Sequence, residues 1–336
     1  MKINFFTLNP NENVGSYRIW VRDLSRSLNE IGHMSNIFNQ NSEIAEFLDC
    51  DVLIFGKSSY DLVSQFKNKI NEARKNRQIK VGGINVAKGH DDKFLDFVIV
   101  GSPEEMCSLS SYDNIFIYPL IEREFENIKP KIHKKSNSFR ICFHGHYPHL
   151  AKFEPFLTKA IESLSKDIDI TLVIITGNEI EWSSKPKNVN IEMHMYDIKN
   201  ISKIIQSCDV GVVPNITDVS TYAPDITSFV SPNIGLYDSD YVIRFKNKTN
   251  GGRAYVFYQH GIPVIHDISP SSFEFMSKVD DYICAHDQLS WEKNLRKMID
   301  EDYRNKVSQI NYNQFNISYN PISHAKKLVE FIESVE

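Results

Sequence analysis

Short apolar runs alternate along this chain with longer segments whose apolar residues recur at helical spacing. This alternation is typical of βαβ units, which build parallel sheets. In the first half, the expected strands span residues 3–8, 35–38, 51–55, 80–86, 97–100 and 114–117. In the second half they span residues 139–144, 168–176, 189–193, 210–213, 241–244 and 264–266.

Helices are expected between these strands. The first spans residues 17–31 and ends at Gly32, because a left-handed cap residue is cheapest as glycine. The others span residues 59–77, 153–164, 201–207, 252–259 and 291–299. The basic residues of 59–77 indicate a solvated face, and they leave open a contact with an anionic membrane surface.

The segment 129–138 breaks this rhythm with proline, lysine and small polar residues. It predicts a linker between an N-terminal domain at 1–128 and a C-terminal domain at 139–320. An amphipathic helix is expected in the last segment, 321–336. We therefore predict an α/β protein with two Rossmann-like parallel-sheet domains facing a cleft, and a C-terminal helix that packs back on the N-terminal domain.

Composition narrows the class of protein. The chain has 336 residues, 41% of them hydrophobic and 24% charged, which is ordinary for a globular protein of two domains. A net charge of −5 gives no basic field for nucleic acid. Five scattered cysteines without a CxxC pair are expected to be reduced and buried. The chain shows no signal-peptide pattern, so a cytoplasmic protein is expected, with any membrane contact peripheral and at the inner face.

Ligands of open parallel sheets bind beyond the carboxyl ends of strands, so candidate chemistry lies in the strand-to-helix loops. Gly15, after the first strand, would let backbone N–H groups approach an anion or a sugar oxygen, although a simple structural turn is an equal reading. His144, Gly145 and His146 follow the first strand of the second half. Their spacing fits a phosphate or base loop better than a zinc site, and no metal is expected.

The most concentrated candidate site is the loop before the expected helix 252–259. Cations, amides and glycines gather there, and together with the helix dipole they would act on a diphosphate. These residues are Arg244, Lys246, Lys248, Asn250, Gly251, Gly252 and Arg253. Asn215 after strand 210–213 and His266 at the end of strand 264–266 complete the expected nucleotide and sugar contacts.

Taken in order, these motifs resemble the GT-B glycosyltransferases of the family described as glycosyl transferases group 1. Residues 207–214, Ser-Cys-Asp-Val-Gly-Val-Val-Pro, look like the family's "aDv.v.P" strand. Residues 254–265 look like its "EAma.G.PVi" segment, and Glu274 matches the glutamate that often follows. The resemblance implies transfer of a sugar from a nucleotide-sugar donor, with Glu274 among the donor contacts.

The chain departs from the family at its glutamate pair, E-x7-E. Counting back from Gly261 places Val256 and Lys248 at those two positions, so neither carboxylate is present. The cationic loop remains to stabilise the departing diphosphate. An inverting enzyme also needs a base for the acceptor hydroxyl, and His90 and Asp91 in the first half are the candidates, with helix capping an equal reading for Asp91.

The sequence therefore predicts a hexosyltransferase-type enzyme without a cofactor or metal requirement. Its acceptor would be a glycan, a lipid-linked sugar or a protein, in bacterial surface polysaccharide or glycoconjugate synthesis. The missing glutamates keep two alternatives open. One is a GT-B enzyme of other chemistry, such as a nucleotide-sugar epimerase or a phosphoryl-type transferase, and the other is a non-catalytic sugar-binding or nucleotide-binding subunit.

Overall fold

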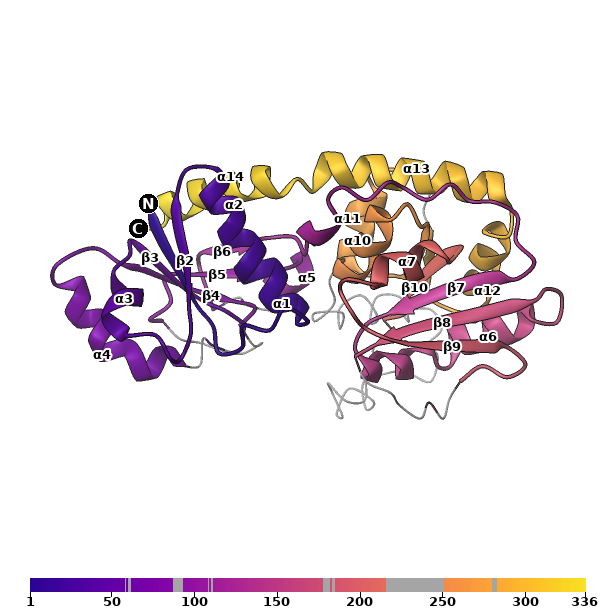
Figure 1. Ribbon diagram of the computed structural model, residues 1–336, viewed down its shortest axis with the longest axis horizontal. Helices are drawn as coiled ribbons and strands as arrows, with labels where there is room; N and C mark the ends of the chain where they lie inside the picture. The colour runs from indigo at the N-terminus through magenta and orange to yellow at the C-terminus, as the bar shows by residue number, and fades with distance from the viewer. Residues whose placement is uncertain are drawn as a thin grey trace, which may run out of the picture. The chain divides into compact units, whose positions relative to one another are not determined.

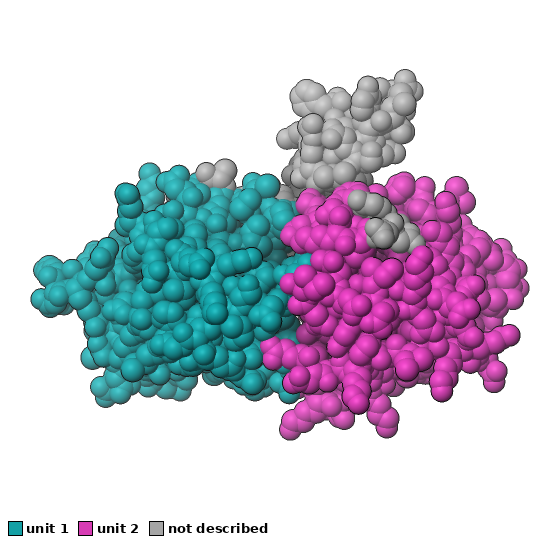
Figure 2. Space-filling view, turned by 90° about the horizontal axis from the view of Figure 1, so that it is seen from above, with its two compact units in different colours: residues 1–124, 318–336 teal, residues 125–317 magenta. Residues whose placement is uncertain are grey.

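The computed structural model describes residues 1–57, 59, 62–86, 93–107, 109, 111–177, 182, 185–215, 251–279 and 283–336. They form two compact units, unit 1 with residues 1–124 and 318–336, and unit 2 with residues 125–317 (Figures 1 and 2). Each unit holds a six-stranded sheet whose strand pairs are parallel. The predicted class, α/β with two Rossmann-like parallel sheets, is confirmed.

Unit 1 has the strand order β2-β1-β3-β4-β5-β6. This order reverses between β1 and β3, as in flavodoxin-like sheets. Its strands are β1 Lys2–Phe6, β2 Met34–Phe38, β3 Val52–Phe55, β4 Lys80–Ile84, β5 Phe97–Val100 and β6 Ile115–Ile117. Its helices are α1 Gly15–Tyr17, the π-helix η1 Arg18–Asp23, α2 Leu24–Glu30, α3 Ile44–Leu48, α4 Val63–Arg74, α5 Pro103–Cys107 and α14 Pro321–Ser334.

Aromatic side chains fill the core of unit 1. Phe6 of β1, Phe47 of α3 and Phe66 of α4 contact one another, with ring centroids 5.1 to 5.4 Å apart. Elsewhere in the unit, the Phe331 ring of α14 lies 6.0 Å from the ring of Phe97 and 5.3 Å from that of Phe116. The C-terminal helix thus packs on the N-terminal sheet, as predicted.

The helix predicted over residues 17–31 is interrupted by the six-residue π-helix η1. A π-helix has a wider turn than an α-helix and brings residues five apart onto one side. Here these residues are Arg18 and Asp23, both buried. Arg18 pairs with Glu122, and Asp23 accepts from the backbone N–H of Arg123. The π-helix therefore turns both charges toward the same segment.

Unit 2 has the strand order β12-β11-β10-β7-β8-β9. Counted from β9, this is the Rossmann order 3-2-1-4-5-6. Its strands are β7 Phe139–His144, β8 Ile170–Thr176, β9 Asn190–Met195, β10 Val210–Val213, β11 Val264–Asp267 and β12 Cys284–Ala285. Its helices are the 3-10 helix η4 Tyr147–Phe153, α6 Phe156–Leu164, α7 Ile201–Gln206, α10 Gly252–Gln259, α11 Pro270–Met276 and α12 Gln288–Lys297.

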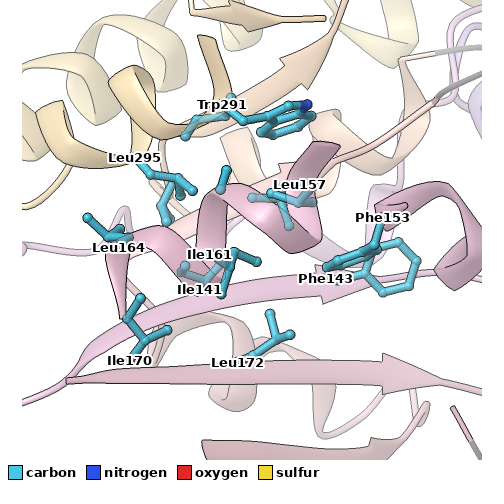
Figure 3. Packing of buried hydrophobic residues seen from close by; sticks show 14 of the residues in the cluster. Ile141, Phe143, Phe153, Leu157, Ile161, Leu164, Ile170, Leu172, Trp291 and Leu295 are labelled. Carbon is cyan, nitrogen blue, oxygen red and sulfur yellow. The ribbon is translucent and has the colours of Figure 1, made fainter. Parts of the chain in front are cut away.

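Helices cover both faces of the unit 2 sheet. On one face, Leu157, Ile161 and Leu164 of α6 lie between strands β7 and β8 and the side chains Trp291 and Leu295 of α12 (Figure 3). On the other face, α10 approaches β10 closely over Gly211. A Cβ at that position would lie 2.6 Å from the ring of Phe257, so only glycine permits this packing.

Two further helices contain the boundaries between the units. The 3-10 helix η3, Arg123–Phe125, contains the boundary after Glu124, and α13, Glu301–Ser318, contains the second boundary. The predicted linker 129–138 lies in unit 2, where His133 bonds to the carbonyl of Gly261 and to the side chain of Asn305. No helix of the described residues is long and apolar enough to cross a membrane.

Candidate functional site

The Rossmann order of unit 2 reverses between β7 and β10, and ligands of such sheets bind beyond the carboxyl ends of these two strands. The chain supplies three segments there. His144 is the last residue of β7, Asn215 follows β10 by two residues, and α10 begins at Gly252 with Gly251 as its N-cap. Contacts among these segments centre on Arg253.

Arg253 lies in the first turn of α10, and its guanidinium group is only partly satisfied. Nη2 donates to Oδ1 of Asn215 at 2.5 Å and lies 3.5 Å from the carbonyl oxygen of Pro214. Nη1 is buried and has no hydrogen-bond partner among the described residues. Because burial disfavours the charged form, the pKa of Arg253 is lowered to about 10, against the attraction of Asp267. The group still carries its charge at neutral pH.

Asp267, at the end of β11, is the buried carboxylate of this cluster. Its Oδ2 accepts from the backbone N–H of Asn215 at 3.1 Å. Its charge attracts Arg253, yet the guanidinium forms no direct ion pair with a carboxylate of the described residues. The sequence predicted the neighbouring His266 as a site residue and not Asp267, which directly follows the expected strand 264–266. A carboxylate directly after a buried strand was the signal available.

The imidazole of His144 bonds to the backbone of α10, so its N–H is already in use. It is 7% exposed, and its Nε2 lies 2.8 Å from the carbonyl oxygen of Arg253. A carbonyl oxygen only accepts, so Nε2 carries the proton. Gly145 follows with a φ of 149°, and a Cβ there would lie 3.1 Å from Cδ of Arg253. Glycine therefore leaves room for the arginine stem.

The remaining histidines of the loop lie further outward. His146 is exposed, and its ring contacts those of Tyr147 and His149. His149 is half-buried, and burial, followed by the charge of Arg253, lowers its pKa to about 4. Three or more His, Cys, Asp or Glu side chains arranged for a metal ion do not occur within the described residues.

Two other predicted donor contacts have partners of their own. His266 is 4% exposed and bonds through Nε2 to the hydroxyl of Tyr258. Its burial, with the nearby charge of Arg253, lowers its pKa to about 3. Glu274 is exposed on α11, and its Oε1 lies 3.3 Å from Nζ of Lys278. Within the described part of the chain, no contact joins Glu274 to Arg253.

Gly15 lies in unit 1, at the start of α1. The space beside it holds Arg18, whose Nη2 would lie 3.7 Å from a Cβ at Gly15. Nη2 of Arg18 donates to Glu122 at 2.7 Å, and Nη1 donates to the carbonyl of Glu12 at 2.6 Å. The guanidinium beside the Gly15 loop is thus paired within unit 1.

The structure brings together His144, Gly145, Asn215 and Arg253 from the predicted set, with Gly251 and Gly252 at the start of the same helix. The other predicted cationic-loop residues, Arg244, Lys246, Lys248 and Asn250, lie outside the described residues. So do the expected strand 241–244 and the candidate base residues His90 and Asp91. Val256, at one of the two glutamate positions of the family, is buried in α10.

Comparison with known proteins finds similarity in the fold but not in the sequence. No family model and no curated protein sequence matches this chain. Solved structures do match. The β-glucosyltransferase of T4 phage is 10% identical, with a TM-score of 0.60 over 99% of this chain and 100% of that one. HepE of Anabaena, solved with UDP-glucose, is 11% identical, with a TM-score of 0.61 over 99% and 100%.

A third structure is AviGT4, described as a glycosyltransferase involved in Avilamycin A biosynthesis. It is 10% identical, with a TM-score of 0.58 over 99% of this chain and 97% of that one. At such low identity the likeness concerns architecture. The fold is that of GT-B glycosyltransferase structures, with two six-stranded parallel sheets.

Proposed function

We propose that this protein is a glycosyltransferase that transfers a hexose from a nucleotide-sugar donor, with unit 2 as the donor domain and unit 1 as the acceptor domain. The observation that carries the proposal is the half-buried guanidinium of Arg253 at the switch point of a Rossmann sheet, whose Nη1 is buried and which has no ion-pair partner among the described residues. A buried charge costs free energy unless it is paired, so this arrangement favours an anionic ligand.

The chemistry of glycosyl transfer needs such a group. Cleaving the bond to a nucleoside diphosphate leaves negative charge on the departing phosphate, and fixed cations and amide dipoles stabilise that charge. In this chain, Nη1 of Arg253 would bind a phosphate oxygen. The amino end of α10, with Gly251 and Gly252, would add its dipole. The amide nitrogen of Asn215 would donate beside it, since Oδ1 already accepts from Arg253.

Other residues complete the proposed site. Arg244, Lys246, Lys248 and Asn250 would add cationic and amide contacts to the diphosphate, and Gly15, His146, His266 and Glu274 would contribute to nucleotide and sugar binding. The base that deprotonates the acceptor would be His90 or Asp91.

We propose a glycan, lipid-linked or protein acceptor, as in bacterial surface polysaccharide or glycoconjugate synthesis, for a cytoplasmic enzyme that contacts the inner membrane face at most peripherally. The net charge of −5 disfavours a DNA acceptor, although the T4 phage neighbour is described as a DNA modifying enzyme. No metal requirement is proposed. Because one structure of that neighbour contains UDP and Mn²⁺, donor assays need arms with Mn²⁺ and with EDTA.

Thermal unfolding with nucleotides tests donor binding directly. A ligand that binds only the folded state stabilises it by about 2.7 kcal/mol at a hundred times its Kd. We expect one of UDP, GDP, ADP or CDP to raise the Tm, and the matching nucleoside without phosphates to leave it unchanged. If no nucleoside diphosphate shifts the Tm at millimolar concentration, the proposal is wrong.

Product analysis separates transfer from the alternative chemistry that the glutamate positions suggest. Val256 and Lys248 stand where retaining relatives carry glutamates, which keeps a nucleotide-sugar epimerase as the second candidate. A transferase releases free nucleoside diphosphate as it consumes the sugar donor. An epimerase would instead yield the epimeric sugar still attached to the same nucleotide, without net release of nucleoside diphosphate. A non-catalytic subunit would bind the nucleotide without any turnover.

A further inference from the structure

His144 contacts α10 at two points, although its sequence position lies more than a hundred residues away. Its Nε2 donates to the carbonyl oxygen of Arg253 at 2.8 Å. Its ring lies 4.9 Å from the ring of Phe257, at an interplanar angle of 67°. Arg253 and Phe257 are one helical turn apart, so the imidazole holds the backbone and the inner face of the first turn together.

The strand fixes the imidazole in turn. His144 is the last residue of β7 and is paired in register with Ile175 of β8. It is 7% exposed, so few other side-chain orientations are open to it. The next residue, Gly145, has a φ of 149° and leaves room for Cδ of Arg253. His144 thus fixes the backbone carbonyl of Arg253, and Gly145 leaves room for the aliphatic part of its side chain.

The charge state of His144 agrees with this role. Burial lowers its pKa to about 4, with the cation of Arg253 acting in the same direction. Of the described groups, His260 also lowers this pKa, while the bond to the Arg253 carbonyl raises it. At neutral pH the imidazole is therefore uncharged and adds nothing to the attraction of an anion. Its one N–H is already used by the backbone.

We propose that His144 is a positioning residue, which orients Arg253 toward an anionic diphosphate and does not itself contact the ligand. This inference rests on the proposed function, because it assigns one residue a task in the same site. It replaces the expectation that His144 contacts the donor substrate as part of a phosphate or base loop.

A double-mutant cycle tests the proposal with UDP and inorganic pyrophosphate as probes, measured by calorimetry. His144→Phe keeps the ring against Phe257 but removes the donor, and Arg253→Met removes the cation. Since His144 acts through Arg253, we expect His144→Phe to weaken binding by about tenfold in the wild-type background and by less than about twofold in Arg253→Met. Equal effects in both backgrounds would mean direct ligand contact and would overturn the proposal.

A conservative variant and a matched control distinguish this role from a general loss of packing. His144→Gln places an amide N–H near the position of Nε2, and we expect it to restore most of the affinity. His260 is also buried, and it bonds to the carbonyl of Val256 at the other end of α10. His260→Phe should therefore lower the Tm without changing the affinity of the folded protein. Weakening by His260→Phe as large as by His144→Phe would contradict the proposal.

The two probes keep this inference apart from the proposed function. If pyrophosphate binds and no nucleoside diphosphate binds more tightly, the glycosyltransferase proposal fails while the cycle still decides the role of His144. If neither probe binds, both proposals fail. Histidine NMR adds a readout without ligand, because the proposal requires the Nε2–H tautomer of His144 at neutral pH, and an Nδ1–H tautomer would overturn it.

Discussion

Arg18 in unit 1 and Arg253 in unit 2 are two arginines with similar settings and different partners. Each lies near the beginning of a helical segment, in a unit whose parallel sheet reverses its strand order, between β1 and β3 in unit 1 and between β7 and β10 in unit 2. Arg18 forms a buried ion pair with Glu122, with Nη2 and Oε2 2.7 Å apart. Among the residues that the structure describes, Arg253 has the neutral amide of Asn215 as its nearest partner, and its Nη1 has no hydrogen-bond partner.

The difference separates a structural cation from a binding cation. A buried ion pair satisfies itself and fixes the chain around it, so it adds little capacity for a ligand. A cation whose direct hydrogen-bond partner is a neutral acceptor is not neutralised by an ion pair, and an anion that enters gains that interaction. By this criterion the described part of unit 1 holds a structural cation at its switch point, and unit 2 holds the cation that we propose binds the ligand.

Acidification should produce the largest difference in stability between the two units. In unit 2, burial lowers the pKa of His144 and His260 to about 4 and that of His266 to about 3. The unfolded chain, with histidine pKa near 6.5, then binds more protons below that pH, so stability falls as the pH drops from about 6.5 toward 4. Each histidine contributes about 1.4 kcal/mol per pH unit, on the order of several kcal/mol together.

In unit 1, two buried carboxyl groups respond to acid in the opposite direction. Burial raises the pKa of Asp23 and Glu122, so protonating them on acidification favours the folded state. Hydrogen exchange measured by mass spectrometry at neutral pH and at about pH 4.5, corrected for the intrinsic rate, should show unit 2 losing protection first. Loss of protection in unit 1 before unit 2 would contradict this account of the histidines.

Removing Arg18, the structural cation, should cause the next largest loss in the free energy of unfolding. Arg18→Met leaves the carboxylate of Glu122 buried without its partner, and breaking a buried pair costs about 3–5 kcal/mol. Urea unfolding measures this change. Arg26→Met is the matched control, because its exposed pair with Glu30 contributes only about 0.3–0.5 kcal/mol. A similar loss in both variants would mean that the Arg18 pair is not a special feature of unit 1.

A pair of glycines gives a smaller contrast between the two units. Gly145 has a φ of 149°, and a Cβ would crowd Arg253. Gly145→Ala should therefore weaken UDP binding by about tenfold, given a backbone strain of about 1–3 kcal/mol. A Cβ at Gly15 would meet Arg18 only at an ordinary 3.7 Å, and φ there is not positive. Gly15→Ala should shift unfolding by less than about 1 kcal/mol, and a larger loss would contradict this description of the Gly15 loop.

Hydrophobic periodicity predicted the sheets well, because buried parallel strands are nearly all apolar. The bounds predicted for β5, β7 and β10 are those of the structure, and so are those of α10. Periodicity failed for α13, whose buried face carries Arg304, Ser308 and Asn311 beside Val307 and Phe315. Arg304 and Ser308 bond to backbone carbonyls, and buried polar side chains of this kind break the apolar stripe by which a helix is recognised.

For the candidate site, the sequence predicted loops that the structure brings together around Arg253, but not which of their side chains bond to one another. Strand-end position and charge were enough to select Arg253 and Asn215. The same rules gave His144 a ligand contact, whereas the structure gives its N–H to a backbone carbonyl. Asp267 was missed because its partner is the backbone N–H of Asn215, 52 residues earlier in the chain. Such partners are set by the packing of the sheet.

Calorimetry of UDP binding to Arg253→Met tests the central claim most directly. Arg296→Met is the control, since it removes an exposed arginine of unit 2 that pairs with Asp167 and Glu292. The account predicts that Arg253→Met weakens UDP binding by about a hundredfold, the loss of a charge-assisted contact of about 2.7 kcal/mol. Its stability should stay equal or rise, because a buried cation without an ion pair is removed. Wild-type affinity in Arg253→Met, or equal weakening in Arg296→Met, would contradict the claim.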